Sequence, residues 1–306
     1  MASVDESPAV GATPGRPLRQ TLAAYVAITK PRIIELLLVT TVPTMILAAQ
    51  GWPSLSTLVA VLAGGTLAAA GANTFNSVYD RDIDAVMHRT QHRPVASGVI
   101  GVRAGVAWGL LLSVASVVVL ATFTNGLAAV LALVAIGFYV LGYTMWLKRR
   151  TPQNIVWGGA AGCMPVLIAW AAVTGTLTWT PVVLFLIIFF WTPPHYWPLS
   201  LRYREDYATA GVPMLPVVAN ERRVALEIVI YAWVMVAMSL VLIPVAPMGW
   251  VYAVSSVVLG AVFLVEAHVL QARARSGNPR PMRLFHWSIT YLSLLFLAVA
   301  IDPFVG

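Results

Sequence analysis

Three aspartates and an asparagine in one short segment are the residues of this sequence best suited to chemistry. The segment, residues 73–94, reads NTFNSVYDRDIDAVMHRTQHRP. Read as a helix, Asn76, Asp80 and Asp84 share one face, whereas Asp82 points away from it. Carboxylates this close raise each other's pKa unless a positive charge lies between them. The spacing therefore predicts a cation site at Asn76, Asp80 and Asp84, with Asp82 as an outer ligand or an arginine partner.

The composition places this segment in a membrane protein. Of 306 residues, 59% are hydrophobic and 10% are charged, and the mean hydropathy is +0.81, far more apolar than a soluble protein requires. Nine apolar runs are about 20 residues long, which is the length that crosses the hydrocarbon layer. They lie at about 33–50, 55–77, 104–122, 126–146, 155–174, 180–200, 224–243, 249–270 and 285–303. We expect an all-α polytopic protein whose nine transmembrane helices surround a central cavity open to the cytoplasmic side.

The basic residues lie in alternate links between these runs. All 19 Lys and Arg residues fall within 16–32, 81–103, 148–150, 202–223 and 273–283. Intervening links such as 51–54 and 244–250 carry none, so the positive-inside rule predicts a cytoplasmic N-terminus and an outside C-terminus. We expect the plasma (inner) membrane of a prokaryote. The net charge of +7 requires no nucleic acid, and it suits anionic lipid headgroups or a phosphorylated substrate.

The remaining features set expectations for the domain organisation. Residues 1–20 are rich in Ser, Pro, Gly and acids and are expected to form a disordered cytoplasmic arm before a single transmembrane domain, 21–306. The lone Cys163 excludes a disulfide framework and a CxxC site. Glu35 either pairs with Arg32 or faces the same cavity as the aspartates.

Two further features concern the sixth run. Its three prolines, Pro193, Pro194 and Pro198, are expected to break the helix, which is tolerated in a membrane where the helix lines a cavity. The second and sixth runs also both lead into long loops with mixed acids and arginines. This similarity indicates two related halves that face each other across a shared site.

Several kinds of site are compatible with the acids. A calcium loop is excluded, because Ala85 and Gln91 stand where that loop needs Gly and Glu. Magnesium fits better, since it binds through one or two carboxylates and completes its shell with water and phosphate oxygens. Arg89, Arg93 and the Lys148–Arg149 pair are suited to grip a diphosphate bridged to that ion. A helix end with local ion pairs and a charge-coupled transporter remain as alternatives.

The N-x-x-x-D-x-x-x-D motif of Asn76, Asp80 and Asp84 resembles the first diphosphate motif of the UbiA-type intramembrane prenyltransferases. Within them, three segments are similar to those of the protohaem IX farnesyltransferase (haem O synthase) family. They are NSVYDRDIDAVMHRTQHRPVASG, YTMWLKRRTPQNIVWGGAAGCMPVLIAWAAVTG and TPPHYWPLSLRYREDYATAGVPMLPVV. The resemblance extends from about Lys30 to the last run. The wider superfamily has a second D-x-x-x-D, but here Arg202 precedes Asp206 by four residues, a departure that this narrower family shares.

The resemblance implies a reaction between protohaem IX (haem b), farnesyl diphosphate and water that gives haem O and diphosphate. It implies Mg²⁺ as cofactor, with haem b as a substrate, and a handover of product to a haem A synthase or an oxidase assembly factor. The implied catalytic and metal-binding residues are Asn76, Asp80, Asp84 and Asp206. The implied substrate-binding residues are Arg89, Arg93, Lys148, Arg149, Arg202 and His195.

The role of His195 stays open between an axial ligand of the haem iron and a polar residue satisfied by the helix break. Two other functions also stay open. One is a prenyltransferase for an aromatic or quinone precursor, and the other is a non-catalytic membrane transporter.

Overall fold

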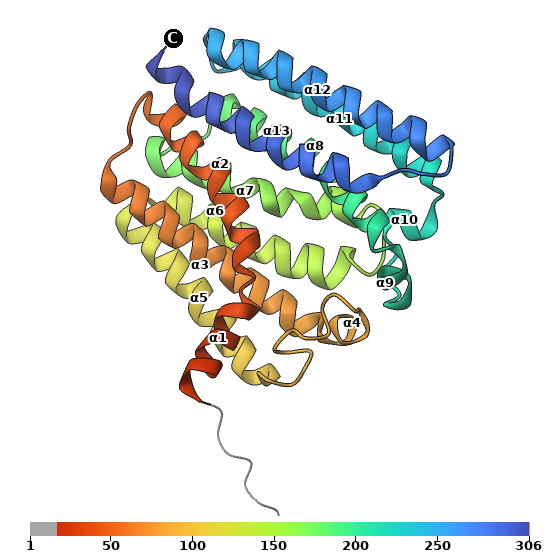
Figure 1. The fold of residues 1–306 in the computed structure, drawn as a ribbon. Coiled ribbons are helices and arrows are strands. Elements are labelled where there is room, and N and C mark those ends of the chain that lie inside the picture. The colour runs from red at the N-terminus through yellow and green to blue at the C-terminus, as the bar shows by residue number, and fades with distance from the viewer. Residues whose placement is uncertain (1–16, 306) are drawn as a thin grey trace, which may run out of the picture.

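Residues 17–305 are described by a computed structural model, and all regular structure within them is helical (Figure 1), as predicted. In chain order the elements are α1 (Leu18–Ile28), α2 (Pro31–Ala49), α3 (Leu55–Tyr79), α4 (Arg81–Val86), α5 (Val102–Phe123), α6 (Gly126–Gly137), the π-helix η1 (Phe138–Leu147), α7 (Asn154–Thr174), α8 (Trp179–Arg202), α9 (Arg204–Thr209), α10 (Leu215–Val218), α11 (Glu221–Val245), α12 (Trp250–Arg275), α13 (Pro281–Ile301) and the short η2 (Asp302–Phe304). Residues 1–16 of the predicted disordered arm lie outside the described residues, and α1 begins at Leu18, within the range assigned to that arm.

Eight helices in residues 17–305 are long and apolar enough to cross a membrane, and the chain is an integral membrane protein. α6 and η1 together form one of them, Gly126–Leu147, and α13 with η2 forms the last, Pro281–Phe304. The first expected span, 33–50, forms α2, within which the described stretch Leu37–Ala49 is apolar but too short by itself to count among these eight. The count of nine spans therefore stays a prediction.

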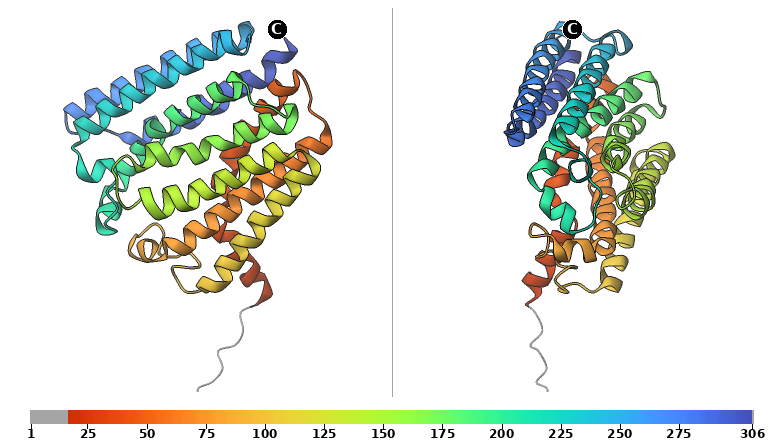
Figure 2. Two further views of the ribbon diagram at one scale, coloured as in Figure 1. Left: turned by 180° about the vertical axis from the view of Figure 1, so that it is seen from behind. Right: turned by 90° about the vertical axis from the view of Figure 1, so that its right-hand side faces the viewer.

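The spans pack in two groups that meet at α2 and α7 (Figures 1 and 2). In the first group α3 packs along α5, and α6 lies against α5 and α7. In the second group α8 packs against α7, α11 and α13, and α12 lies against α11 and α13. A separate buried hydrophobic cluster fills each group, and α7 contributes to both, with Cys163 free and buried.

Close contact between α3 and α5 fixes the helix that carries the acidic motif. A Cβ atom added at Gly71 would lie 2.4 Å from Ser113 Oγ and 3.1 Å from the Gly109 carbonyl oxygen. A side chain of α5 also bonds the backbone of α3, because Ser116 Oγ donates to the Gly64 carbonyl oxygen at 2.7 Å. Small residues at such positions let membrane helices approach closely, which holds the end of α3 in a fixed place.

The expected break in the sixth apolar run does not occur. α8 continues from Trp179 to Arg202 with Pro193, Pro194 and Pro198 inside it. Each proline removes one backbone N–H donor, but α8 is packed among neighbouring helices, and such packing permits prolines within membrane helices.

The irregular helix lies instead in the span before α7. Residues 138–147 form the π-helix η1, and the Lys148 backbone N–H still donates to the Tyr143 carbonyl five residues earlier, at 2.9 Å. A π-turn places more residues in each turn than an α-turn, and such segments are frequent at functional sites. Here it directs Thr144 inward, where it is fully buried.

We expect Gly71→Ala to destabilise the protein, because the added methyl group overlaps Ser113 and the backbone of α5. Overpacking of this kind costs about 1–3 kcal/mol. Thermal unfolding of the purified protein in detergent measures the change. The matched control is Gly137→Ala, where an added Cβ meets no atom within 4 Å. Equal melting temperatures for the two variants would contradict the proposed close packing of α3 on α5.

Candidate active site

The end of α3 and the short helix α4 carry the acidic motif. α3 ends at Tyr79, and Asp80 joins it to α4. The Asp84 N–H donates to the Asp80 carbonyl at 2.8 Å, so helical spacing continues through the junction. Asp80 and Asp84 are only 0% and 2% exposed, and the Asn76 amide donates to Asp80 Oδ2 at 2.7 Å. The predicted common face is confirmed, and it is buried.

Basic side chains neutralise both buried carboxylates. Lys148, which follows η1, places its Nζ 2.5 Å from Asp80 Oδ2. Arg93, in the loop after α4, places Nη1 2.8 Å from each oxygen of Asp84. A buried ion pair of this kind is stable only when its geometry is good and its remaining polar atoms are bonded. The predicted positive charges beside the acids are therefore present, and they come from two different loops.

Asp82 lies off this face, as its spacing predicts. Its side chain is 62% exposed, and both of its oxygens bind Arg149, at 2.7 and 2.8 Å. The hydrogen bonds from Arg149 lower the pKa of Asp82 to about 2. The same guanidinium lies over the ring of Tyr79 at 4.9 Å and donates to the Tyr79 carbonyl at 3.3 Å. Asp82 thus orients Arg149 beside Asp80, to which Arg149 approaches within 3.6 Å.

Lys30 is a site residue that the sequence reasoning missed. Its Nζ donates to Asn76 Oδ1, while the Asn76 amide also reaches Thr144 Oγ1 at 3.0 Å. Burial, followed by the charges of Arg93 and Lys148, lowers the pKa of Lys30 to about 7. Its backbone has a φ of 56°, which is strained in a residue that precedes proline. The one signal in the sequence is a lysine at a helix start, and that is equally typical of positive-inside residues.

The second acidic segment, α9, lies beside the first at one end of the bundle (Figures 1 and 2). Asp206 Oδ2 accepts from the Arg89 backbone N–H at 3.4 Å, and the Arg89 guanidinium lies 5.5 Å from the ring centre of Tyr203. Residues of α4, α9 and the following loop share one hydrophobic cluster, which includes Ile83 and Tyr207. The expectation that the two loops face a shared site agrees with this packing.

Two sequence candidates make no hydrogen bond or ion pair with the aspartates within residues 17–305. Arg202, at the end of α8, is exposed and forms no ion pair within the described part of the chain. His195, on α8, lies between Trp191 of the same helix and Phe285 of α13, with ring centres at 4.1 and 4.8 Å. Its Nδ1 bonds Ser288 Oγ at 2.7 Å.

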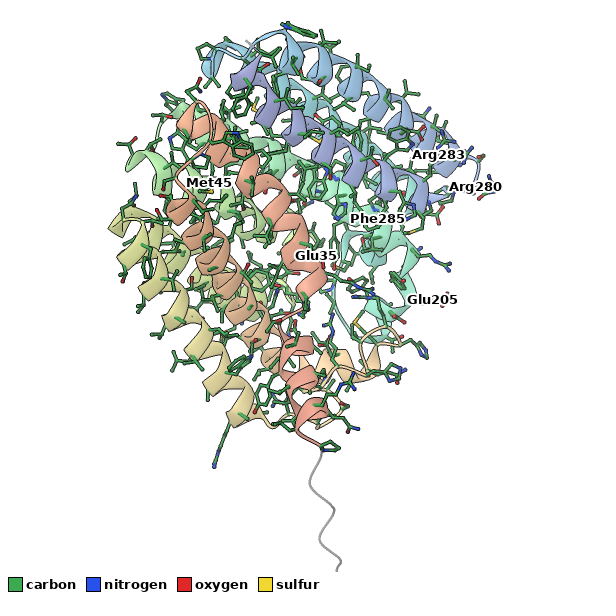
Figure 3. The ribbon with its side chains drawn as sticks, turned by 60° about the vertical axis from the view of Figure 1, so that its left-hand side comes forward. Glu35, Met45, Glu205, Arg280, Arg283 and Phe285 are labelled. Atoms are coloured by element: carbon green, nitrogen blue, oxygen red, sulfur yellow. The ribbon has the colours of Figure 1, made fainter. Side chains whose placement is uncertain are left out.

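Of the two roles expected for Glu35, a place in the cavity of the aspartates stays a prediction. Glu35 is exposed on α2 and forms no ion pair in residues 17–305 (Figure 3). Its predicted pairing with Arg32 is therefore wrong.

One oxygen of the acidic face is available for a further ligand. Asp80 Oδ1 is buried and accepts no hydrogen bond within residues 17–305, although Arg149 Nη2 lies 3.6 Å from it. Among these residues no group of three or more His, Cys, Asp and Glu side chains is placed to hold a metal ion, so Asp206 does not complete a three-acid cluster. Two carboxylates and an amide fit a hard cation whose other ligands are water or phosphate oxygens.

Removal of Arg93 should destabilise the protein, because Asp84 would remain charged, buried and without its partner. Arg93→Met is expected to cost about 3–5 kcal/mol in unfolding free energy. The double variant Arg93→Met/Asp84→Asn should recover much of this loss, since the uncompensated charge is gone. Denaturant unfolding in detergent measures both variants. The control is Arg223→Gln, which removes an exposed guanidinium from its pair with the partly buried Glu227 but keeps a hydrogen-bond donor there, and it should cost about 0.5 kcal/mol.

Comparison with known proteins identifies the relatives of this chain. Residues 37–289 match the UbiA prenyltransferase family. The chain is 59% identical over 281 residues to "Protoheme IX farnesyltransferase" of Clavibacter michiganensis subsp. michiganensis, covering 92% of each chain. It is 55% identical over 294 residues to the protein of the same name from Streptomyces avermitilis, covering 95% of this chain and 96% of that one.

Solved structures share the fold at low sequence identity. One, of a digeranylgeranylglyceryl phosphate synthase, has a TM-score of 0.76 at 17% identity and covers 93% of this chain and 99% of its own. Another, a UbiA homologue from Archaeoglobus fulgidus bound to GPP and Mg²⁺, has a TM-score of 0.61 at 17% identity and covers 90% of this chain and 99% of its own. The extent of these matches and the arrangement of the helices show that this chain belongs to the UbiA prenyltransferase family.

Proposed function

We propose that this protein transfers the farnesyl group of farnesyl diphosphate to a vinyl group of protohaem IX and adds water, giving haem O and diphosphate. The observation that carries the proposal is the buried acidic face of Asn76, Asp80 and Asp84 among basic side chains, in a chain 54–59% identical to relatives named for this reaction. Lys30, Arg93, Lys148 and Arg149 are four cations that contact this face or Asp82 beside it. Arg93, Lys148 and Arg149 balance Asp80, Asp82 and Asp84, and Lys30, whose pKa is about 7, would gain its full positive charge beside a bound anion, which favours an anionic ligand.

The donor set fits Mg²⁺. Asp80, through its unbonded Oδ1, would hold the ion together with Asp84 and Asn76, and a second ion would need Asp206. When bound, Mg²⁺ would neutralise the negative charge that grows on the leaving diphosphate. Lys148 and Arg93, which pair with Asp80 and Asp84, would bind diphosphate oxygens, with Arg89, Arg149 and Arg202 as further contacts. Asp82 keeps Arg149 oriented through two hydrogen bonds.

The transfer step follows from this arrangement. The bond between C1 of the farnesyl group and oxygen breaks, and its electron pair leaves with the diphosphate, whose charge the basic side chains stabilise. The outer carbon of a haem vinyl group then attacks C1. Water captures the new cation beside the porphyrin ring and loses a proton, which yields the hydroxyl group of haem O. The apolar walls of the bundle exclude water from the first of these cations.

His195 is our candidate ligand for the haem iron. Ser288 occupies its Nδ1, so Nε2 is the ring nitrogen with no hydrogen-bond partner in the described residues. Rings on both faces of the imidazole hold its plane. A neutral imidazole held in this way is suited to ligate iron through Nε2.

We also propose an orientation and a destination for the product. The basic loops that hold Arg93 and Lys148 would face the cytoplasm, with the C-terminus outside, in the plasma membrane of a prokaryote. Haem O would pass to a haem A synthase or an oxidase assembly factor in the same membrane.

Purified protein incubated with haem b, farnesyl diphosphate and Mg²⁺ should form haem O, detected by mass spectrometry. Asp80→Asn and Asp84→Asn should each lower the rate at least about 100-fold, because charge stabilisation at the leaving group is lost. Glu221→Gln, in the first turn of α11 and outside the site, is the control and should stay within a few-fold of the original rate. EDTA should stop the reaction and Mg²⁺ should restore it. Prenylation of 4-hydroxybenzoate in place of haem would contradict the proposed acceptor, and no turnover at all would favour a transporter.

Lys30→Met should weaken farnesyl diphosphate binding about tenfold or more, because a charged group that contacts Asn76 is removed. Lys30→Arg should restore part of the affinity. Isothermal titration with Mg²⁺ present measures both variants. Arg32→Met removes an exposed charge two residues away and should leave affinity unchanged. A Lys30→Met protein with unaltered affinity would exclude Lys30 from the diphosphate site.

A further inference from the structure

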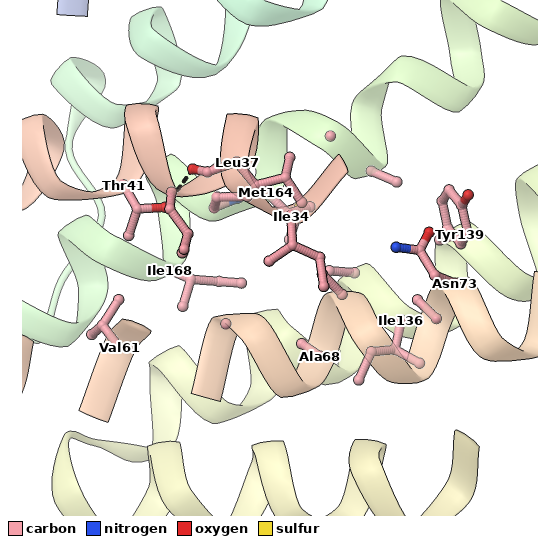
Figure 4. A pocket seen from close by; sticks show the side chains of 18 residues that line it. Ile34, Leu37, Thr41, Val61, Ala68, Asn73, Ile136, Tyr139, Met164 and Ile168 are labelled. Atoms are coloured by element: carbon pink, nitrogen blue, oxygen red, sulfur yellow. Dashed lines mark hydrogen bonds between the residues drawn. The ribbon is translucent and has the colours of Figure 1, made fainter. Parts of the chain in front are cut away.

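An apolar cavity lies within the bundle (Figure 4), and one of its lining residues, Asn73, is one helical turn from Asn76 of the acidic face. It is bounded by α2, α3, α7 and the junction of α6 with η1, and its volume is about 130 Å³. Asn73 and Tyr139 line it, and so do Val61 and Ile168 (Figure 4). Its α3 wall continues the same helix face as Asn76, because residues three or four apart lie above one another.

The size of the cavity matches one isoprene unit. A cavity of about 150 Å³ accommodates one benzene molecule, so the space here holds about five or six carbon atoms. A farnesyl chain differs from a geranyl chain by one such five-carbon unit at the end remote from the diphosphate. The cavity therefore has the volume of the group that distinguishes these two substrates.

Distances along the helices that line the cavity also agree with the length of a farnesyl chain. Gly65 lies eleven residues before Asn76 on α3, which is about 16 Å along the helix. An extended farnesyl chain is about 14 Å long, since carbon–carbon bonds of about 1.5 Å meet at tetrahedral angles. With its diphosphate at Asn76 and Asp80, the last isoprene unit would lie near Gly65. On α7, Gly162 is about 12 Å along the helix from Asn154, which bonds the carbonyl of Lys148.

The two glycines of the cavity wall differ from the glycines that pack helices together. A Cβ atom at Gly65 or Gly162 would meet no atom within 4 Å, although both residues line the cavity. By contrast, a Cβ atom at the adjacent Gly64 would lie 2.6 Å from Leu120. Helix packing thus explains Gly64 but not Gly65 or Gly162.

We propose that Gly65 and Gly162 determine which prenyl chain length this protein accepts, by leaving room for the third isoprene unit. This inference rests on the proposed function insofar as the donor is a prenyl diphosphate, but it does not depend on the acceptor. A larger side chain at either position would project into the cavity and occupy the space of the terminal unit. The donor preference would then shift from farnesyl diphosphate to geranyl diphosphate.

The test compares Gly65→Leu and Gly162→Leu with the original protein. Isothermal titration measures the binding of farnesyl diphosphate and geranyl diphosphate in the presence of Mg²⁺, without haem. We expect each variant to lower the ratio of farnesyl diphosphate affinity to geranyl diphosphate affinity about tenfold or more. A misfit of even one methylene group in an apolar pocket changes discrimination by at least about this factor. Gly65→Ala should produce a smaller shift in the same direction. The matched control is Gly137→Leu, which adds the same side chain in open space outside the cavity and should keep the original ratio.

The outcomes separate this inference from the proposed function. Unchanged ratios in Gly65→Leu and Gly162→Leu proteins that melt at the original temperature would overturn the role of both glycines. An equal shift in Gly137→Leu would also overturn it, because the effect would not be specific to the cavity. If the original protein binds both diphosphates but does not convert haem b, the proposed acceptor fails while the affinity ratio still tests the glycines. If it binds neither diphosphate, both proposals fail.

Discussion

Compensation of charge inside the protein is the constraint on which this site depends. Asp80 and Asp84 are buried at the end of a membrane helix, where an unpaired carboxylate is strongly unfavourable. Lys148 and Arg93 remove that cost, and each comes from a loop that joins a different pair of spans. The acidic face is therefore stable only when these loops are in place. The same cations would face the diphosphate, so the interactions that stabilise the fold also prepare the site for an anion.

Helix packing supplies the precision that these charges require. The close approach of α3 and α5 at Gly64 and Gly71 fixes the end of α3. The π-helix η1 then changes the direction of the following residues, so that Thr144 bonds Asn76 and Lys148 bonds Asp80. An ordinary α-helix in the same span would rotate these side chains away from the acidic face, because each turn would hold fewer residues.

Burial also divides the site into a charged end and an apolar end. The acids and their cations gather at the junction of α3 and α4, whereas no charged residue lines the cavity beside α2 and α7. A prenyl diphosphate has the same division, with an anionic head and a hydrocarbon tail. An apolar channel also protects a carbocation from water, so one arrangement serves both recognition and chemistry.

The sequence by itself determined the fold class and the acidic motif. Apolar runs of membrane length require helices, because no water is present in the bilayer to bond free backbone groups. The four-residue spacing of Asn76, Asp80 and Asp84 already places them on one face, and it places Asp82 outside it. Run length and residue spacing are properties of one continuous segment, so the sequence of that segment is enough to predict them.

Only the tertiary structure decided which partners reach that face. Lys30 looked like an ordinary residue at a helix start, and its contact with Asn76 spans 46 positions of sequence. The prolines of α8 predicted a break that packing against its neighbours prevents, whereas the irregular turn at η1 had no signal in its sequence. Gly64 and Gly65 are identical neighbours in the chain, yet one packs against Leu120 and the other borders a cavity. Such differences depend on which side chains pack against each residue, and those side chains come from distant parts of the chain.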